Sequence, residues 1–316
     1  MVAPKLRFKE FDGDWCTLKY KDVLTIKYGK DHKLLNEGVF PVYGTGGIMR
    51  YADQYLHDGE SILIGRKGTI DQPKYVNEKF WTVDTLFYTQ IKDNSIPLFL
   101  YQHALQVNWL GLNEATGVPS LNTTSINNVD ISLPSKEEQT KIASFLSAVD
   151  EKISQLSQKL HLLEQYKQGM MQQLFSQQIR FKADDGSDFE EWIECKLGEI
   201  STTFSGGTPK STNKEFFIGT IPFIKSGEIS KKYTDQFINE LALKESSAKL
   251  VKKGDLLYAL YGATSGQVAL SQIDGAINQA VLCIRSNLNI KYLLNFFLWK
   301  KDSILSTYLQ GGQGNL

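Results

Sequence analysis

Cysteine is scarce in this sequence, and long apolar runs are missing. The three cysteines, Cys16, Cys195 and Cys283, are scattered over 316 residues without CxxC spacing. An odd and scattered set argues against a disulfide framework and against a zinc site, and it is typical of reduced thiols in a cytoplasmic protein. We find no secretory leader and no apolar run long enough to cross a bilayer, so the sequence predicts neither export nor membrane insertion.

The sequence also lacks an excess of either charge. Lysine and arginine together number 35, as do aspartate and glutamate, so the formal net charge is zero. Neutrality does not favour general binding to polyanions, but affinity for phosphate depends on where the cations lie, and a local basic surface stays compatible with it. The four histidines, His32, His57, His103 and His161, are too dispersed to predict a metal site.

Motifs of catalysis are missing as well. The stretch "IGRKGTI" is glycine-rich and basic, but it lacks the GxxxxGK[ST] pattern that cradles nucleotide phosphates. There is no NPPY-type or DPPY-type tetrapeptide of an amino-methyltransferase and no GxGxxG after a strand. A GxSxG elbow and an HExxH pair are also missing. The sequence therefore favours a non-catalytic chain with no cofactor of its own.

The sequence does contain an internal repeat. The stretch "RFKEFDGDW" at 7–15 returns as "RFKADDGSDFEEW" at 180–192, and "VFPVYGTGGIMRYA" resembles "TIPFIKSGEISKKY". Glycines and leucines later in the two copies recur at one constant offset. Such self-similarity indicates two homologous domains.

Each copy is predicted to be an α+β domain with a curved mixed sheet. The short apolar runs "SILIG", "TLFYTQI", "DLLYALYG" and "AVLCIR" are typical of strands. The stretches "IPLFLYQHALQVNWL" and "IKYLLNFFLWKKDSILSTYL" have apolar residues at helical spacing. We predict a first domain over residues 1–134, a long helix over 135–179 and a second domain over 180–316.

Apolar residues between the copies recur at alternating spacings of four and three, which is a heptad seam. The seam consists of Ile142, Leu146, Val149, Ile153, Leu156, Leu160, Leu163, Met170 and Leu174, with Lys167 as its one polar position. Ser135 and Glu138, just after Pro134, form a capping-box pattern that predicts the helix start. At 1.5 Å per residue the seam runs for about 50 Å. Apolar side chains left in water lose their burial energy, so the seam predicts a partner helix. A helix packed on its own globular domain is the alternative.

These features together resemble a known family, the DNA-specificity subunits of type I restriction–modification systems. The most specific stretch is "ISLPSKEEQTKIASFLSAVDEKI" at 131–153, supported by "PVYGTGG", "GRKGTI" and the "LGEI" that opens the second copy. The order of domain, helix and second domain is itself a trait of that family, and the resemblance covers the whole chain.

The resemblance implies that each repeated domain is a target recognition domain reading one half of a split DNA sequence. It implies paired long helices that set the distance between the half-sites. It further implies a subunit without catalytic activity that binds double-stranded DNA and scaffolds methyltransferase subunits and restriction or translocase subunits. S-adenosylmethionine, ATP and magnesium would then belong to those partners and not to this chain.

Candidate DNA-contacting residues follow from the chemistry of recognition, which needs polar groups for base edges and cations or amides for phosphates. They lie in polar and glycine-rich stretches that recur at matching places in the two copies. In the first copy they are Lys27, Tyr28, Lys30, His32, Lys33, Thr45, Arg50, Tyr51, Arg66, Lys67 and Thr69. In the second copy they are Thr208, Lys210, Ser211, Thr212, Lys214, Lys225, Ser226, Lys231, Lys232, Tyr233, Tyr261, Thr264, Ser265 and Gln267. The alternative for any one of them is a solvated loop residue.

The second copy stops without a counterpart of residues 122–179, so we expect it to lack a closing strand and a second long helix. The seam would then be covered by self-association, with two chains pairing their helices antiparallel, or by a methyltransferase subunit. Two other functions remain open. One is a non-catalytic coiled-coil oligomerisation module that binds another protein. The other is the specificity part of a related methylation system outside type I.

Overall fold

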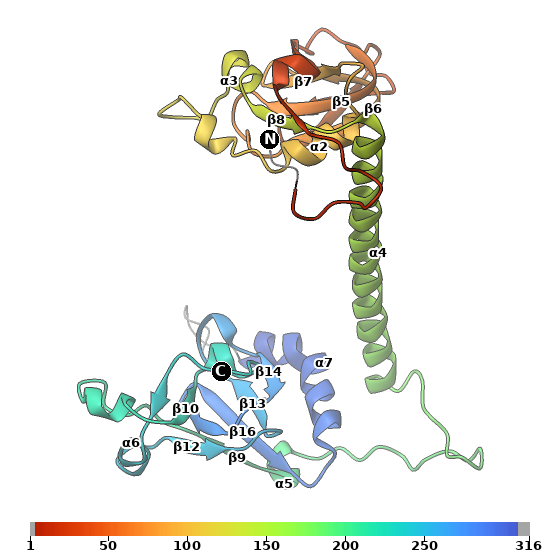
Figure 1. Cartoon of the computed structure of the whole chain (residues 1–316). Helices are drawn as coiled ribbons and strands as arrows, with labels where there is room; N and C mark the ends of the chain where they lie inside the picture. Colours follow the sequence, from red (N-terminus) through yellow and green to blue (C-terminus); the bar gives the residue numbers. More distant parts are fainter. Residues whose placement is uncertain (1–3, 309–316) are drawn as a thin grey trace. The chain divides into compact units, whose positions relative to one another are not determined.

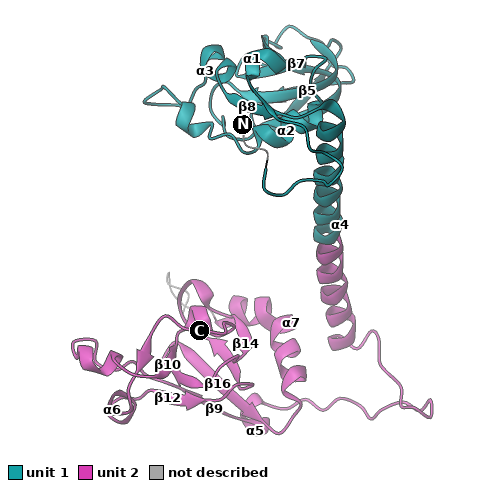
Figure 2. Cartoon of the chain, in the orientation of Figure 1, with its two compact units in different colours: residues 1–158 teal, residues 159–316 magenta. Residues whose placement is uncertain are grey.

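The computed structural model describes residues 4–308, and the chain divides into two compact units, 1–158 and 159–316 (Figure 2). The boundary falls inside the long helix α4 (Lys136–Phe175), which is 40 residues long and contributes to both units. Each unit combines mixed β-sheets with short helices, which confirms the predicted α+β class.

Unit 1 is built on a six-stranded mixed sheet with the order β2-β7-β5-β6-β3-β4. Strands β5, β6 and β7 of this sheet are labelled in Figure 1. Its strands are β2 (Leu24–Tyr28), β3 (Phe40–Gly44), β4 (Gly47–Ala52), β5 (His57–Gly65), β6 (Lys74–Thr82) and β7 (Leu86–Ile91). Only β3 and β6 pair in parallel. Strand β5 pairs first with β6 and then with β7. At that crossing the Ser61 hydroxyl donates to the carbonyl and accepts from the N–H of Thr89, and the Thr89 hydroxyl accepts from the N–H of Ile62.

A two-stranded sheet and several short helices close unit 1. They are β1 (Cys16–Lys19), paired antiparallel with β8 (Asp130–Leu133), then α1 (Tyr20–Val23), α2 (Pro97–Ala104), η1 (Leu110–Leu112) and α3 (Thr123–Asn127). The main core lies between α2 and the sheet, where Ile62, Ile64, Phe87 and Leu100 are fully buried. The sequence pattern predicted that this helix extends to Leu110, but α2 ends six residues earlier. The indole of Trp109 folds back and donates to the carbonyl of Ala104.

Helix α4 leaves unit 1 directly after β8 and begins where the sequence predicted. The hydroxyl of Ser135 accepts from the backbone N–H of Glu138 at 3.3 Å, which is half of the expected capping box. The carboxylate of Glu138 binds Arg7 instead of completing the box.

Unit 2 contains two four-stranded sheets, with the orders β11-β10-β15-β12 and β14-β13-β16-β9. Its strands are β9 (Ser201–Ser205), β10 (Ile221–Ile224), β11 (Phe237–Ile238), β12 (Lys249–Val251), β13 (Leu256–Ala259), β14 (Val268–Leu270), β15 (Gly275–Ile277) and β16 (Val281–Ser286). Its helices besides the end of α4 are α5 (Leu197–Ile200), η2 (Lys214–Phe217), η3 (Ser226–Glu228), α6 (Glu240–Lys244), η4 (Gly262–Thr264) and α7 (Ile290–Tyr308).

The two units repeat one strand order. The run β2-β7-β5 of unit 1 corresponds to β9-β16-β13 of unit 2, and β6-β3-β4 corresponds to β15-β10-β11. The difference lies in β5 and β6, because the place of β5 is taken by β12 and β13 and the place of β6 by β14 and β15. The glycine between β12 and β13, Gly254, has φ of +93°, and its repeat partner Gly59 has φ of +109° inside β5. The repeat therefore preserves a left-handed backbone position that glycine adopts without steric penalty.

The segment that forms β1 in unit 1 is not a strand in unit 2. Its repeat counterpart, Ile193–Lys196, carries no strand assignment, and the side chain of Ile193 is 87% exposed. Among the described residues, unit 2 contains no strand that pairs with this segment as β8 pairs with β1.

The heptad seam lies on α4 as predicted, and its burial varies along the helix. Ile142 packs against the core of unit 1, whereas Ile153, Leu156, Leu160 and Leu163 are each more than half exposed. The alternative of a helix buried along its length on its own domain is therefore excluded for the middle of α4. Within residues 4–308, no helix is long and apolar enough to cross a membrane.

Candidate nucleic-acid interface

In unit 1 three of the eleven candidate residues meet at the end of β3. A pocket of about 690 Å³ is lined by His32 and Lys33 from the β2–β3 loop, by Thr45 and its glycine neighbours in the β3–β4 turn, and by Val83–Thr85 from the β6–β7 turn. The parallel pairing of β3 with β6 places these two turns side by side. The structure thus brings together His32, Lys33 and Thr45, which the sequence could only assign separately.

The β2–β3 loop is held against this pocket by the backbone. The backbone N–H of Lys30 donates to the carbonyl of Thr82, and the indole of Trp81 donates to the carbonyl of Lys30. A side chain on Gly29 would lie 2.0 Å from the carbonyl oxygen of Val83, so the loop approaches the sheet closely because residue 29 is glycine.

Other first-copy candidates lie beside the pocket, not in it. Lys27 and Tyr28 belong to strand β2. The sequence had suggested that they lie in a loop. Arg66 stacks its guanidinium over the Tyr28 ring at 5.5 Å and donates to the carbonyl of Asp84, which lines the pocket. Lys67 forms an isolated β-bridge with Ser120. The remaining first-copy residues are Lys30 in the β2–β3 loop, Tyr51 on β4 and Thr69 after β5.

Arg50 is engaged within unit 1. It lies on β4, and its guanidinium donates to the carbonyls of Leu35 at 2.7 Å and Asn36 at 3.1 Å. These bonds tie the β2–β3 loop, which supplies His32 and Lys33 to the pocket, to the sheet.

In unit 2 five of the fourteen second-copy candidates meet at the equivalent strand end. A pocket of about 450 Å³ follows β10, the counterpart of β3. The structure brings five candidates together here, since the pocket is lined by Lys225, Ser226, Lys231, Tyr261 and Thr264. The loop after β13 supplies two of them through η4, in which Gly262 has φ of +77°.

Glu228 organises this pocket and was not among the residues picked out from the sequence. Its carboxylate accepts from the backbone N–H of Lys225 and Asp235 and from the hydroxyl of Thr234, and it is only 8% exposed. Burial raises the pKa of Glu228, but these hydrogen bonds and the charge of Lys225 outweigh it, so the pKa is lowered overall. The acid three positions after Lys225 was the available signal, since this spacing closes a one-turn helix.

The other second-copy candidates lie outside this pocket. Thr208 donates to the side-chain oxygen of Gln279 at 2.6 Å, and Ser265 donates to the carbonyl of Leu260. The ammonium of Lys231 lies 5.5 Å from the centre of the Tyr233 ring. Lys210, Ser211 and Thr212 follow β9, Lys214 begins η2, Lys232 follows η3, and Gln267 precedes β14.

Both pockets offer hydrogen-bond donors and acceptors next to cationic side chains. That mixture suits base edges, which present donors and acceptors, together with flanking phosphates. No group of three or more His, Cys, Asp or Glu residues that could hold a metal ion occurs in the described part of the chain. The arrangement fits recognition of a polar surface.

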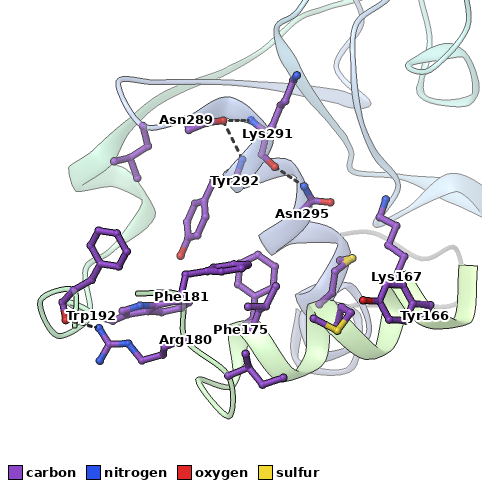
Figure 3. A pocket seen from close by; sticks show the side chains of 16 residues that line it. Tyr166, Lys167, Phe175, Arg180, Phe181, Trp192, Asn289, Lys291, Tyr292 and Asn295 are labelled. Carbon is purple, nitrogen blue, oxygen red and sulfur yellow. Dashed lines mark hydrogen bonds between the residues drawn. The ribbon is translucent and has the colours of Figure 1, made fainter. Parts of the chain in front are cut away.

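Another pocket of unit 2 has the opposite chemistry. It has a volume of about 1000 Å³, and its lining from the end of α4, the following linker and the start of α7 is almost entirely apolar (Figure 3). The rings of Phe175, Trp192 and Tyr292 gather along it, with centroids 5.6 to 6.5 Å apart. An apolar, aromatic surface of this kind fits a protein segment better than a phosphate backbone.

Comparisons with known proteins agree with this geometry. A sequence profile of the type I restriction modification DNA specificity domain matches residues 12–165 and 189–316. The chain is 27% identical to the type I restriction enzyme MjaVIII specificity subunit of Methanocaldococcus jannaschii, over 80% of this chain and 66% of that subunit. It is also 27% identical to the EcoR124I/EcoR124II specificity subunit of Escherichia coli, over 40% of this chain and 34% of that subunit.

The fold is shared with a solved structure, the crystal structure of the S subunit of a type I restriction–modification system from M. genitalium. The TM-score is 0.65 with 16% identity, over 96% of this chain and 81% of that one. The chain spans less than two thirds of the length of the curated relatives named above. Since the family profile covers most of both units, the chain belongs to the family of type I restriction modification DNA specificity domains.

Proposed function

We propose that this chain reads a bipartite DNA target, with one half-site contacted by each unit, as part of a type I restriction–modification complex. The observation that carries the proposal is the pair of polar pockets at equivalent strand ends, after β3 in unit 1 and after β10 in unit 2. Different side chains line the two pockets, so the two half-sites would differ in sequence. Helix α4 would act as the spacer, because a helix fixes distance and rotation where a flexible linker would not.

The chain would work as a non-catalytic scaffold in that complex, in the cytoplasm where its DNA lies. Its partners would be methyltransferase subunits and restriction or translocase subunits. S-adenosylmethionine, ATP and magnesium would be bound by those partners. The apolar pocket and the exposed part of the α4 seam offer surfaces for protein contacts.

Two partners for the seam follow from its chemistry, a methyltransferase subunit or a second copy of this chain. The edges of the seam carry separated charges, with Lys152 and Lys159 on one side and Asp150 and Glu164 on the other. In an antiparallel pair of identical helices, like edges face each other, so these charges repel across the interface. Self-association of this kind would therefore be weakened at low salt, and a partner helix with the opposite edge charges would bind more tightly.

The experiment that tests the proposal maps methylated bases in a host that carries this gene with its partner subunits. Replacing residues 1–134 with the matching domain of a relative should change one half of the methylated motif and leave the other half unchanged. An unchanged motif, or a motif altered in both halves, would contradict the assignment of one half-site to each unit.

The second candidate function is a coiled-coil oligomerisation module that binds protein, which the exposed seam favours. Filter binding of random duplex DNA at several salt concentrations separates the two. A DNA reader retains duplex with an affinity that falls steeply with salt, whereas a protein-binding module retains none.

A further inference from the structure

The first turns of α4 are joined to unit 1 by a buried glutamine. Gln139 is 0% exposed, and its amide makes three hydrogen bonds. Its oxygen accepts from the backbone N–H of Ile96 at the start of α2, and its nitrogen donates to the carbonyls of Asn94 and Pro134 at 3.2 and 2.9 Å. One side chain therefore ties α4 to the loop before α2 and to the end of β8.

A second set of contacts grips a different face of the same helix. Residues 7–10, which we call the strap, run along α4. Arg7 forms a bidentate pair with the buried carboxylate of Glu138, at 2.7 and 2.6 Å, and also donates to the carbonyl of Gly13. Two turns further along, Phe8 meets Phe145 edge to face at 5.8 Å. The strap therefore follows the helix for about two turns.

These contacts lie on two sides of the helix axis. Glu138 and Phe145, seven residues apart, face the strap, whereas Gln139 and the buried Ala143 face the core. Contacts on one side leave a helix free to roll or tilt, and contacts on two sides remove both freedoms. Glu10 of the strap also forms an ion pair with Lys141 at 3.3 Å, and Asp150 accepts from Gln102. After Asp150 in the sequence, no hydrogen bond or ion pair joins α4 to another element in the part of unit 1 that the structure describes.

We infer that Gln139 and the Arg7–Glu138 pair are positioning residues that fix the direction and rotation of α4 relative to the reading face of unit 1. The effect of these residues on DNA spacing rests on the proposed bipartite recognition. The contacts that join α4 to unit 1 do not depend on it. A rigid spacer selects a spacing only if it is also rigidly joined to the reader. One added base pair turns one half-site by about 34° relative to the other, so a loose joint would tolerate it.

The choice of a glutamine supports a positioning role over a purely stabilising one. A buried apolar side chain would tolerate small rotations of the helix. The amide of Gln139 has three directional bonds to two segments, the loop before α2 and the end of β8, and a roll of α4 breaks its bonds to that loop inside the core.

The geometry can be tested on the full chain without DNA. Spin labels are placed at Asn77→Cys on β6 and Ser157→Cys on α4, in a background with Cys16→Ser and Cys195→Ser. The distance distribution between them is measured by double electron–electron resonance. We expect Gln139→Ala to broaden the distribution roughly twofold, because the supporting bonds that lock the helix are lost. Gln155→Ala is the matched control, since Gln155 is an exposed glutamine of α4 that bonds only to Glu151 of the same helix.

Arg7→Lys provides a second variant, because it keeps the charge, lies outside the core and loses the bidentate geometry. A thermal melt of each variant establishes that it is folded at the temperature of the measurement, and Arg7→Lys decides the question if Gln139→Ala is unfolded. An unchanged width in the folded variants would overturn the inference.

The functional arm uses the methylated motif once it is mapped. Wild-type chain should bind a duplex with one extra spacer base pair about tenfold more weakly than the native target. Gln139→Ala should reduce that discrimination to about threefold or less, while Gln155→Ala retains it. If the wild type binds both duplexes with equal affinity, the proposal of bipartite recognition is wrong. The widths of the spin-label distance distributions still decide whether Gln139 and Arg7 position α4.

Discussion

At the scale of single residues, the polar pockets depend on side chains that hold loops as much as on side chains that face outward. Glu228 and Arg50 both bond to backbone groups, and each holds a loop that supplies residues to a candidate site. Substitution at these positions should therefore be read through stability first and recognition second.

Glu228→Ala should lower the free energy of unfolding of unit 2 by about 1–3 kcal/mol, because the backbone N–H of Asp235 and Lys225 lose their acceptor. The pKa of Glu228 is lowered in the folded state, so its contribution is present above the ordinary carboxyl pKa and is lost as the pH falls through the folded-state pKa. Urea denaturation at pH 7 and pH 3 should show a smaller difference in the variant than in the wild type. Glu194→Ala, at an exposed position, is the control. An equal pH dependence of stability in Glu228→Ala and in the wild type would refute the role of Glu228.

Lys231→Gln tests the cationic wall of the same pocket. If Lys231 contacts a phosphate, the slope of log affinity against log salt should decrease by about one, and affinity should fall similarly for all sequences. Filter binding over a salt series measures both. Lys249→Gln on β12, which does not line the pocket, should leave the slope unchanged; a loss confined to one sequence would indicate base contact instead.

The sequence predicted which stretches carry the polar candidate residues. It did not predict which of those residues line the same pocket. Lys225 and Tyr261 are far apart in the sequence and line one pocket because β10 and β13 end close together. The sequence assigned both Arg50 and Arg66 to DNA contact, and in the structure both guanidiniums donate to backbone carbonyls. Whether a guanidinium finds a carbonyl depends on loop closure, and no local pattern reports that.

At the scale of secondary-structure elements, the best-predicted feature was α4 and the least predictable was the break in the long strand of unit 2. Heptad spacing depends only on the sequence of the helix itself. The division of a strand into β12 and β13 depends on which neighbours it pairs with, and that is set by the rest of the sheet.

Gly254→Ala should destabilise unit 2 by about 1–2 kcal/mol, because φ of +93° brings a Cβ into conflict with its own backbone. The space around Gly254 is open, so crowding does not contribute. Gly198→Ala in helix α5 is the matched control, with open space and no positive φ, and it should be neutral or stabilising. Chemical denaturation of the two variants measures the contrast, and equal effects would argue against a backbone cause.

At the scale of the whole molecule, the apolar side chains in the exposed middle of the α4 seam predict a binding partner that would bury them. If the partner is a second copy, sedimentation equilibrium should show a dimer whose association strengthens with salt, since salt screens the like-charged edges. Leu156→Lys should then abolish the dimer, whereas Gln158→Lys on the outer face should leave it intact. A monomer at micromolar concentration under all salts would leave a different subunit as the occupant of the seam.

The pairing of β1 with β8 determines how unit 1 would respond to mechanical load. Cys16 lies opposite Leu133 and Lys19 lies opposite Asp130, so the chain enters and leaves this ladder at the same end. A pull between residue 7 and α4 would peel the four pairs apart one after another and would not shear them together. The bidentate Arg7–Glu138 contact lies on the loaded side of the ladder. The Arg7–Glu138 contact would therefore have to break before a pull between residue 7 and α4 could separate β1 from β8.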